Sequence, residues 1–325
     1  MVGGLECSHR RAEQVNEPYA PPSRAPCYEP GMGDLRRDTA VEALDEGSDK
    51  RSDSGSNAVA DTSPDARRFR GEICPDWDLW GPVGGYLAAI AVRAAGASTA
   101  LDRPASVACH YLSPARFGPV ELSVTTGRRS RRAQSLRVLM TQRAAPVLEA
   151  LVWAVAADLP GPDAHWVLAP DAPPPDALPV FDPAQDLGGD PTAATPFWKN
   201  VEIRQVFLPG ESRDPGGEPM LRSWERYLPQ GAYGDPWADA ARLLISADVS
   251  IYPAIAKGFA APNFIAPNLD LYVAFHTAPP TDEHLLIETR GTAAGGGLVS
   301  GRTRIWSPAG DLVASGTSQL LCRMF

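Results

Sequence analysis

The segment Gly84-Gly-Tyr-Leu-Ala-Ala-Ile-Ala-Val-Arg-Ala-Ala95 contains one charged residue, and apolar side chains occupy nearly all of its other positions. A helix formed by this segment would be apolar on nearly every face, so it would have to be buried almost all round. The cover must come from strands around it. We therefore predict a central helix wrapped by a sheet.

Four runs rich in β-branched and apolar residues follow this helix, and Pro or Gly residues separate them. The predicted strands are 106–112, 120–126, 134–141 and 147–155. The first half of the chain is thus expected to form one helix followed by four antiparallel strands. A strand within Asp38–Leu44 could pair with Arg68–Ile73 across a long hairpin loop.

The second half of the chain repeats this order. A helix is predicted from Trp237 to about Ala256, and strands are predicted at 269–275, 284–289, 297–306 and 311–322. An offset of about 164 residues relates the halves, because it carries Tyr111 onto Phe275 and Gly127 onto Gly291. The matched order of elements indicates that one fold is made twice, each time as a long helix wrapped by an antiparallel sheet.

Segments without apolar periodicity divide the chain. Residues 158–190 contain eight prolines, which exclude a continuous helix or an interior strand, so we expect a linker there. Residues 1–33 are expected to form a disordered tail, and residues at about 45–67 a mobile loop. The remaining ranges, 34–157 and 191–325, are the two predicted units.

Composition narrows the classes of function. The 325 residues carry a net charge of −9, which argues against a general affinity for nucleic acid or anionic lipid. No apolar stretch approaches the roughly 20 residues that span a bilayer. Five scattered cysteines without a CxxC pair suggest neither a disulfide framework nor a zinc site. We expect a cytoplasmic protein without a metal or other cofactor.

Two features could carry chemistry. Gly84 and Gly85 begin the apolar helix, and the free N–H groups of a helix start could hold an acyl oxygen that glycine allows to approach. The pair could equally serve only for tight packing. Asp270 lies within the β-prone segment Asn268–Phe275, where Asp is disfavoured. It could be a solvated residue at the strand start or a base that deprotonates water.

The sequence resembles the double-hotdog acyl-CoA thioesterases of the bacterial type II kind. The resemblance rests on four segments in order, which are Trp80-Gly-Pro-Val-Gly-Gly-Tyr-Leu, His110-Tyr-Leu-Ser-Pro-Ala, Asn268-Leu-Asp-Leu-Tyr-Val-Ala-Phe-His and Gly310-Asp-Leu-Val-Ala-Ser. It implies an α+β fold, a tandem (double) hotdog in which antiparallel sheets each wrap a long central helix. It also implies that acyl-CoA thioesters are hydrolysed to free acid and coenzyme A by water.

The resemblance assigns the site residues. Asp270 matches the family aspartate that activates water, and Thr292 falls at the hydroxyl position. The family glutamine falls on Ser318, with Gln319 one residue later, and a slip of one residue turns a side chain to the other face of a sheet. We predict Asp270, Thr292 and Gln319 as catalytic residues. Gly84 and Gly85 are predicted to hold the thioester oxygen.

A basic run follows Gly127 at a likely hairpin tip. Arg128, Arg129 and Arg131 could contact the phosphates of coenzyme A, although a solvated turn explains them equally well. The alternative functions are a non-catalytic acyl-CoA-binding protein and, with less support, an enoyl-CoA hydratase or dehydratase, because fold alone does not assign chemistry. An exposed sheet edge on each unit makes self-association into a homo-oligomer plausible.

Overall fold

A computed structural model describes residues 31–44, 66–164, 166–206 and 217–325, which belong to one compact unit, Gly31–Phe325. Most of the predicted disordered tail and of the predicted mobile loop lies outside the described residues. Within the predicted tail, Gly33 is described and buried, and its N–H donates to Asn200 Oδ1 at 2.7 Å.

The first half forms a helix and strands close to the predicted ones. Its elements are α1 Leu35–Asp38, β1 Glu42–Ala43, β2 Arg67–Ile73, a 3₁₀ helix Pro75–Trp77, α2 Gly84–Ala97, β3 Arg103–Tyr111, β4 Gly118–Arg129, β5 Ala133–Gln142 and β6 Ala145–Val155. The predicted hairpin is smaller than expected, because residues 35–38 are helical and only β1 pairs with β2.

The second half repeats this series. Its elements are β7 Val201–Gln205, β8 Met220–Tyr227, α4 Pro236–Val249, α5 Ile251–Ala256, β9 Phe264–Ile265, β10 Asp270–Phe275, β11 Leu285–Gly295, β12 Leu298–Trp306, β13 Leu312–Leu321 and β14 Arg323–Met324. The predicted single helix is two helices that meet at Ser250. The Ser250 Oγ donates to the Ser246 carbonyl oxygen and bonds to Thr289 Oγ1, which ties this point to the sheet. Strands β7 and β8 were not predicted.

Twelve of the described strands form a continuous antiparallel sheet in the order β1-β2-β4-β5-β6-β3-β10-β13-β12-β11-β8-β7, and β9 pairs with β14 in a separate two-stranded sheet. Read outward from the centre, each half shows the same sequence of elements, so β3 corresponds to β10, β6 to β13 and β2 to β8. This confirms the duplication. The halves are joined where β3 pairs with β10, with Val107 opposite Val273 and Cys109 opposite Leu271.

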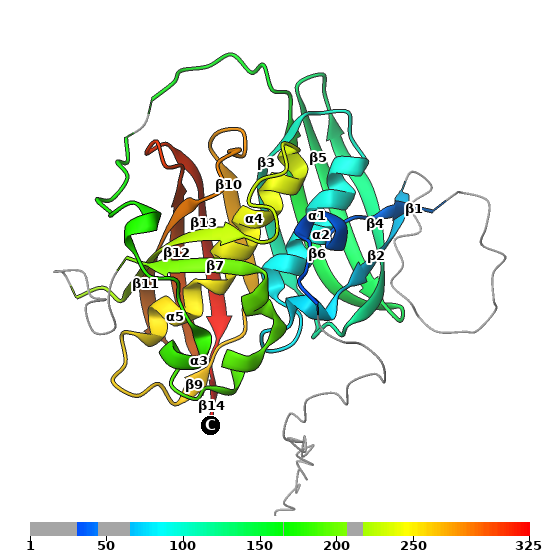
Figure 1. The fold of residues 1–325 in the computed structure, drawn as a ribbon. Helices are drawn as coiled ribbons and strands as arrows, with labels where there is room; N and C mark the ends of the chain where they lie inside the picture. Colours follow the sequence, from blue (N-terminus) through cyan, green and yellow to red (C-terminus); the bar gives the residue numbers. More distant parts are fainter. Residues whose placement is uncertain (1–30, 45–65, 165, 207–216) are drawn as a thin grey trace, which may run out of the picture. The chain divides into compact units, whose positions relative to one another are not determined.

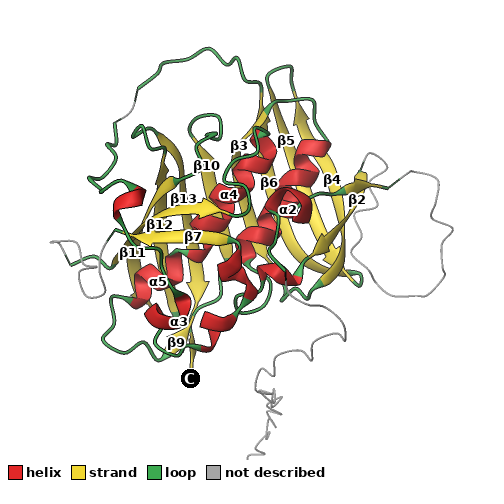
Figure 2. Cartoon of the chain, in the orientation of Figure 1, coloured by secondary structure: helices red, strands yellow, loops and turns green. Residues whose placement is uncertain are grey.

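Helices α2 and α4 pack against each other and lie on the same side of the sheet (Figures 1 and 2). Ten of the fourteen residues of α2 are buried, as its composition predicted. Alanines dominate the buried residues of α2, and small side chains allow helices to approach closely. No described helix combines the length and apolar character needed to cross a bilayer.

The Pro-rich segment 158–190 covers part of the sheet. It contains a 3₁₀ helix, Pro175–Ala177, and α3, Pro183–Asp186, and two more 3₁₀ helices follow at Pro191–Ala194 and Pro196–Lys199. Trp224 Nε1 donates to the Pro173 carbonyl oxygen at 2.8 Å, and the segment packs over Trp224 and Trp306. The segment therefore links the units and also buries apolar side chains on the face of the sheet away from α4.

Candidate active site

The start of α2 meets the end of α4. Val83, the N-cap residue of α2, makes no side-chain capping bond, and the Gly85 N–H donates to the carboxylate of Asp248 on α4. A Cβ on Gly85 would lie 2.6 Å from Ile245 Cα and 2.6 Å from the Leu244 carbonyl oxygen. Glycine is therefore required here for packing between helices. The same glycine leaves its amide open to a carboxylate.

Asp248 receives hydrogen bonds from both halves of the chain. Asn268 Nδ2 donates to its Oδ1 at 2.6 Å, and the Tyr111 hydroxyl donates to the same oxygen at 3.3 Å. Asp248 is 8 % exposed, whereas the preceding residue, Ala247, is fully buried. Burial raises its pKa to about 6, although the bonds from Gly85, Tyr111 and Asn268 oppose the rise. Asp248 was not predicted from the sequence, and the signal that could have found it is a carboxylate near the end of a helix rich in apolar residues.

Asp270 begins β10, two residues after Asn268. Leu271 and Val273 are buried in the core, so strand alternation places Asp270 on the opposite face of the sheet. The half-buried Asp270 accepts a bond from the Gln319 N–H through Oδ1 at 2.8 Å, and it lies directly opposite His110 on β3. Because the Asn268 side chain bonds to Asp248 of α4 on the inner face, the chain passes from one face to the other at this strand end.

The structure separates Ser318 from Gln319. Ser318 is 3 % exposed, and its Oγ donates to the Asp270 carbonyl oxygen at 2.6 Å. Gln319 is exposed on the face that carries Asp270, and its backbone N–H makes the bond to the carboxylate. The residue at the family glutamine position is thus the buried serine, while Gln319 adjoins the Asp270 carboxylate.

Thr292 lies farther from this group. It is exposed at a bulge in β11, between the pairs Gly291 to Gly301 and Ala293 to Ser300. Ser300 on β12 in turn lies opposite Gln319. Thr292 therefore shares a row of the sheet with Gln319 and Asp270, but β12 separates it from Gln319.

Arg128, Arg129 and Arg131 are exposed at the β4–β5 hairpin, as predicted. Arg128 pairs with Ser135 on β5, Ser135 pairs with Trp153 on β6, and Trp153 pairs with Ser106 on β3. Ser106 is four residues from His110, which lies opposite Asp270. At roughly 3.3 Å per residue, the hairpin lies about 13 Å along the sheet from Asp270, and β4 is four strands away from β10 in the sheet. The structure does not bring this run into contact with Asp270.

A second buried carboxylate lies under α4. Ser246 Oγ donates to Glu225 Oε2 at 2.6 Å, and Ser223 Oγ donates to Glu225 Oε1 at 3.2 Å. Burial raises the pKa of Glu225 to about 7 against these two bonds. Neither serine carries a positive charge, so the carboxylate is stabilised only by dipoles.

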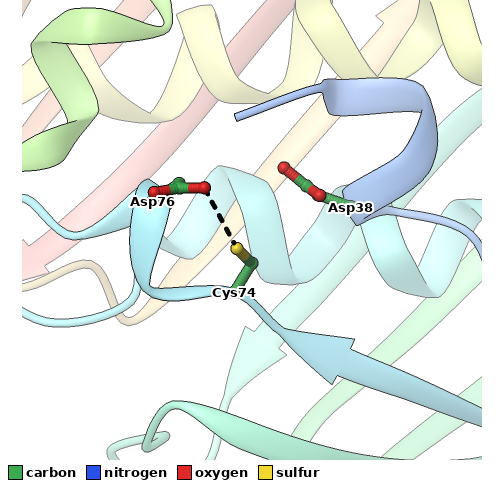
Figure 3. Close-up of side chains that lie close together, drawn as sticks. All are labelled: Asp38, Cys74 and Asp76. Carbon is green, nitrogen blue, oxygen red and sulfur yellow. Dashed lines mark hydrogen bonds between the residues drawn. The ribbon is translucent and has the colours of Figure 1, made fainter. Parts of the chain in front are cut away.

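One group of potential metal ligands occurs among the described residues, namely Asp38, Cys74 and Asp76 near the end of β2 (Figure 3). Their ligand atoms lie within 4.8 Å of one another. Asp38 already accepts bonds from Arg37 Nε and Trp77 Nε1, and the Cys74 thiol bonds to Asp76. The group is thus held together by bonds within the protein, and no metal chemistry is needed to explain it.

Surface hollows occur elsewhere. One of about 350 Å³ lies between the Pro-rich segment and Trp224, and one of about 210 Å³ is lined by Ser113, Arg116 and Arg143 after the end of β3. Neither is lined by Asp248 or Asp270.

Comparison with known proteins identifies the family to which both halves of the chain belong. A model of the acyl-CoA thioesterase N-terminal domain matches residues 73–155, and a model of the C-terminal domain of the same family matches residues 162–322. The chain belongs to the acyl-CoA thioesterase family. No curated protein matches it.

Solved structures show the same double hotdog fold. A hot dog fold protein of unknown function from Alicyclobacillus acidocaldarius has a TM-score of 0.69 and 21 % identity, and the match covers 90 % of this chain and 98 % of that one. An acyl-CoA thioesterase II from Mycobacterium marinum has a TM-score of 0.66 and 17 % identity, with 90 % and 97 % covered. A putative thioesterase from Novosphingobium aromaticivorans has a TM-score of 0.63 and 24 % identity, and the match covers 82 % of this chain and 99 % of that one.

Membership of the family makes the chain a thioester hydrolase of the acyl-CoA type, which confirms the activity class predicted from the sequence. In this acyl-CoA thioesterase, the pairing of β3 with β10 brings the helix start of the first domain next to the second domain. The junction of the two domains is therefore the candidate active site.

Proposed function

We propose that this thioesterase hydrolyses acyl-CoA by direct attack of water at the domain junction, with Asp270 as the base. The observation that carries the proposal is the strand end at Asn268–Asp270. There, Asn268 reaches the Asp248 carboxylate beside the Gly85 amide, and the Asp270 carboxylate follows two residues later. Groups suited to an acyl oxygen and to a water molecule thus lie at the same end of the central strand β10, where the chain passes from one face of the sheet to the other.

In the proposed reaction, Asp270 accepts a proton as the water oxygen bonds to the thioester carbon. The carbonyl electrons move onto oxygen, and the amide of Gly84 at the helix start receives this charge, because the Gly85 N–H is already bonded to Asp248. The tetrahedral intermediate then collapses, the C–S bond breaks, and the coenzyme A thiolate takes up the proton that Asp270 accepted from water, which restores the base. Gln319, adjacent to Asp270, and Thr292, on the same row of the sheet, align the water. No covalent acyl-enzyme forms.

The acyl-CoA phosphates are the proposed ligands of Arg128, Arg129 and Arg131. Guanidinium groups bind phosphate through two parallel hydrogen bonds, and all three side chains are exposed. The hairpin lies well away from Asp270, so the pantetheine arm would have to run along the sheet between them.

The test is the release of free thiol from acyl-CoAs of graded chain length by wild type and by Asp270→Asn. We expect hydrolysis in wild type and a loss of at least about 10²-fold in kcat in the variant, as for removal of a general base. Binding of acyl-CoA by wild type without turnover would instead indicate an acyl-CoA-binding protein. Hydration of crotonyl-CoA without thiol release would indicate a hydratase.

A further inference from the structure

The two helix starts at the domain junction are capped in different ways. At the start of α4, Asp235 caps its own helix by accepting the Trp237 N–H at 2.9 Å, and Arg93 of α2 pairs with it at 2.7 Å. At the start of α2, the cap is Asp248 from the other domain. Its partners among the described residues are the Gly85 amide, the Tyr111 hydroxyl and the Asn268 amide, which are all neutral donors.

This difference appears in the ionisation of the two carboxylates. Burial alone would raise the pKa of Asp235, but the hydrogen bond and charge of Arg93 hold it below its usual value. Asp248 lacks such a cation among the described residues, and its pKa rises to about 6. An uncompensated buried carboxylate lowers stability relative to a neutral group of the same shape. Stability alone therefore gives no reason for a carboxylate at position 248.

The partners of Asp248 belong to the parts of the proposed reaction. Gly85 directly follows Gly84, the proposed donor to the thioester oxygen, and Asn268 is two residues from Asp270. Tyr111 ends β3, and its backbone N–H donates to the Leu269 carbonyl oxygen at 3.0 Å, so it holds the same strand end. One carboxylate thus connects the helix start of the first domain with the strand that carries the base.

We propose that Asp248 is a positioning residue of the thioesterase site, whose ionised carboxylate sets the helix start at Gly84 and Gly85 and the Asp270 strand end relative to each other. The inference rests on the proposed function and adds a residue to it. An ionised carboxylate accepts from all three donors, whereas a protonated one has to donate at one oxygen. Protonation therefore disturbs the alignment without unfolding the junction.

The groups that face Asp248 leave it as the group that titrates near pH 6. On β3 they are Tyr111 and Cys109, and burial raises the pKa of both, that of Cys109 to about 12. Asp270 is the single charged residue of β10, and β13 has none. On α2, Arg93 is engaged with Asp235 at the other end of the helix pair. We expect kcat to fall with a midpoint near pH 6 as the pH is lowered.

The experiment uses the full chain and follows the loss of thioester absorbance in the ultraviolet from pH 4.5 to 9. Asp248→Asn keeps the volume but turns an amide donor toward three donors. We expect kcat to fall about 10²-fold, the loss typical of a misplaced oxyanion donor, with KM little changed. We also expect the limb near pH 6, which is the fall in kcat with that midpoint, to disappear from the pH profile. The variant should be at least as resistant to urea at pH 8 as wild type.

Asp235→Asn is the matched control, because it removes the other inter-helix carboxylate without touching the site. We expect it to lose stability and to keep both kcat and the limb near pH 6. If Asp248→Asn does not fold, Asn268→Ala and Tyr111→Phe remove the partners singly, and each should lower kcat more than it raises KM.

The outcomes separate the two proposals. A wild type that hydrolyses no acyl-CoA overturns the proposed function. An active wild type whose limb near pH 6 persists in Asp248→Asn, or whose kcat is unchanged by that substitution, overturns the positioning role alone. A variant that loses stability but keeps its kcat per folded molecule shows that Asp248 only holds the helices together.

Discussion

The close approach of α2 to α4 predicts a large effect of one methyl group at Gly85. A Cβ there would lie 2.6 Å from two backbone atoms of α4, Ile245 Cα and the Leu244 carbonyl oxygen, and 2.8 Å from Asp248 Cβ. Backbone atoms of a buried helix cannot move individually, so the helices must separate. Such overpacking typically costs about 1–3 kcal/mol.

Two terms of opposite sign decide the magnitude for Gly85→Ala. We place the free-energy cost of the clash at the upper end of that range, because two of the three contacts are with backbone atoms. Alanine favours the helix over glycine by up to about 1 kcal/mol, which offsets part of the loss. We expect the free energy of unfolding to fall by about 2 kcal/mol, measured by urea denaturation. We also expect kcat to fall, because the Gly85 amide moves with its helix.

Gly127→Ala is the control for this prediction. A Cβ at Gly127 would have its nearest neighbour, Ser135 Oγ, at 3.7 Å, which is an ordinary contact. Its free energy of unfolding should stay within about 0.5 kcal/mol of wild type. A Gly85→Ala protein as stable and as active as Gly127→Ala would refute the close packing of the two helix starts.

Other regions give independent predictions. Glu225→Gln should stabilise the protein at pH 8 by up to about 3 kcal/mol, since the pKa rises from 4.5 to about 7 and each unit is worth about 1.4 kcal/mol. The free-energy cost of the buried Glu225 charge is fully present above about pH 7 and absent below about pH 4.5. Wild type and Glu225→Gln should therefore have similar free energies of unfolding in acid. Equal urea midpoints of the two proteins at pH 8 would contradict this prediction. Replacing Arg128, Arg129 and Arg131 by alanine should raise KM for acyl-CoA and leave KM for acyl-pantetheine, which lacks the phosphates, unchanged; an equal rise for both substrates would contradict phosphate binding. Trp306→Ala should destabilise by about 3–5 kcal/mol in denaturation experiments, because this side chain is 1 % exposed beneath the Pro-rich segment; a loss below about 1 kcal/mol would show that the segment covers little.

The duplicated fold was predictable because local patterns carry it. The helix at Gly84–Ala97 has apolar residues on nearly every face, and each of the ten predicted strands corresponds, in whole or in part, to an observed one. Strands β7 and β8 were missed because mixed charged residues such as those of β8 weaken the alternation. The repeat itself contained the missing information, because β2 precedes the first helix as β8 precedes the second.

The candidate site was less predictable, because it depends on contacts between distant segments. The role of Asp270 was predicted from the family resemblance. The faces of the sheet on which Ser318 and Gln319 lie depend on how β13 pairs with the irregular start of β10. Asp248 was missed because its three partners are separated from it by 20 to 163 residues in the sequence, as with Asn268 at 20 and Tyr111 at 137. No local pattern places a helix end of one domain against a helix start of the other.

The most direct test of a catalytic site at the domain junction is a titration observed at the glycine amides. The protein, labelled with ¹⁵N at its 29 glycines, would be titrated with a ketone analogue of acyl-CoA in which a methylene group replaces sulfur. We expect the Gly84 and Gly85 resonances to shift most, because the ketone oxygen takes the place of the thioester oxygen. Saturable binding that leaves both resonances unmoved would contradict the assignment of the active site to the start of α2.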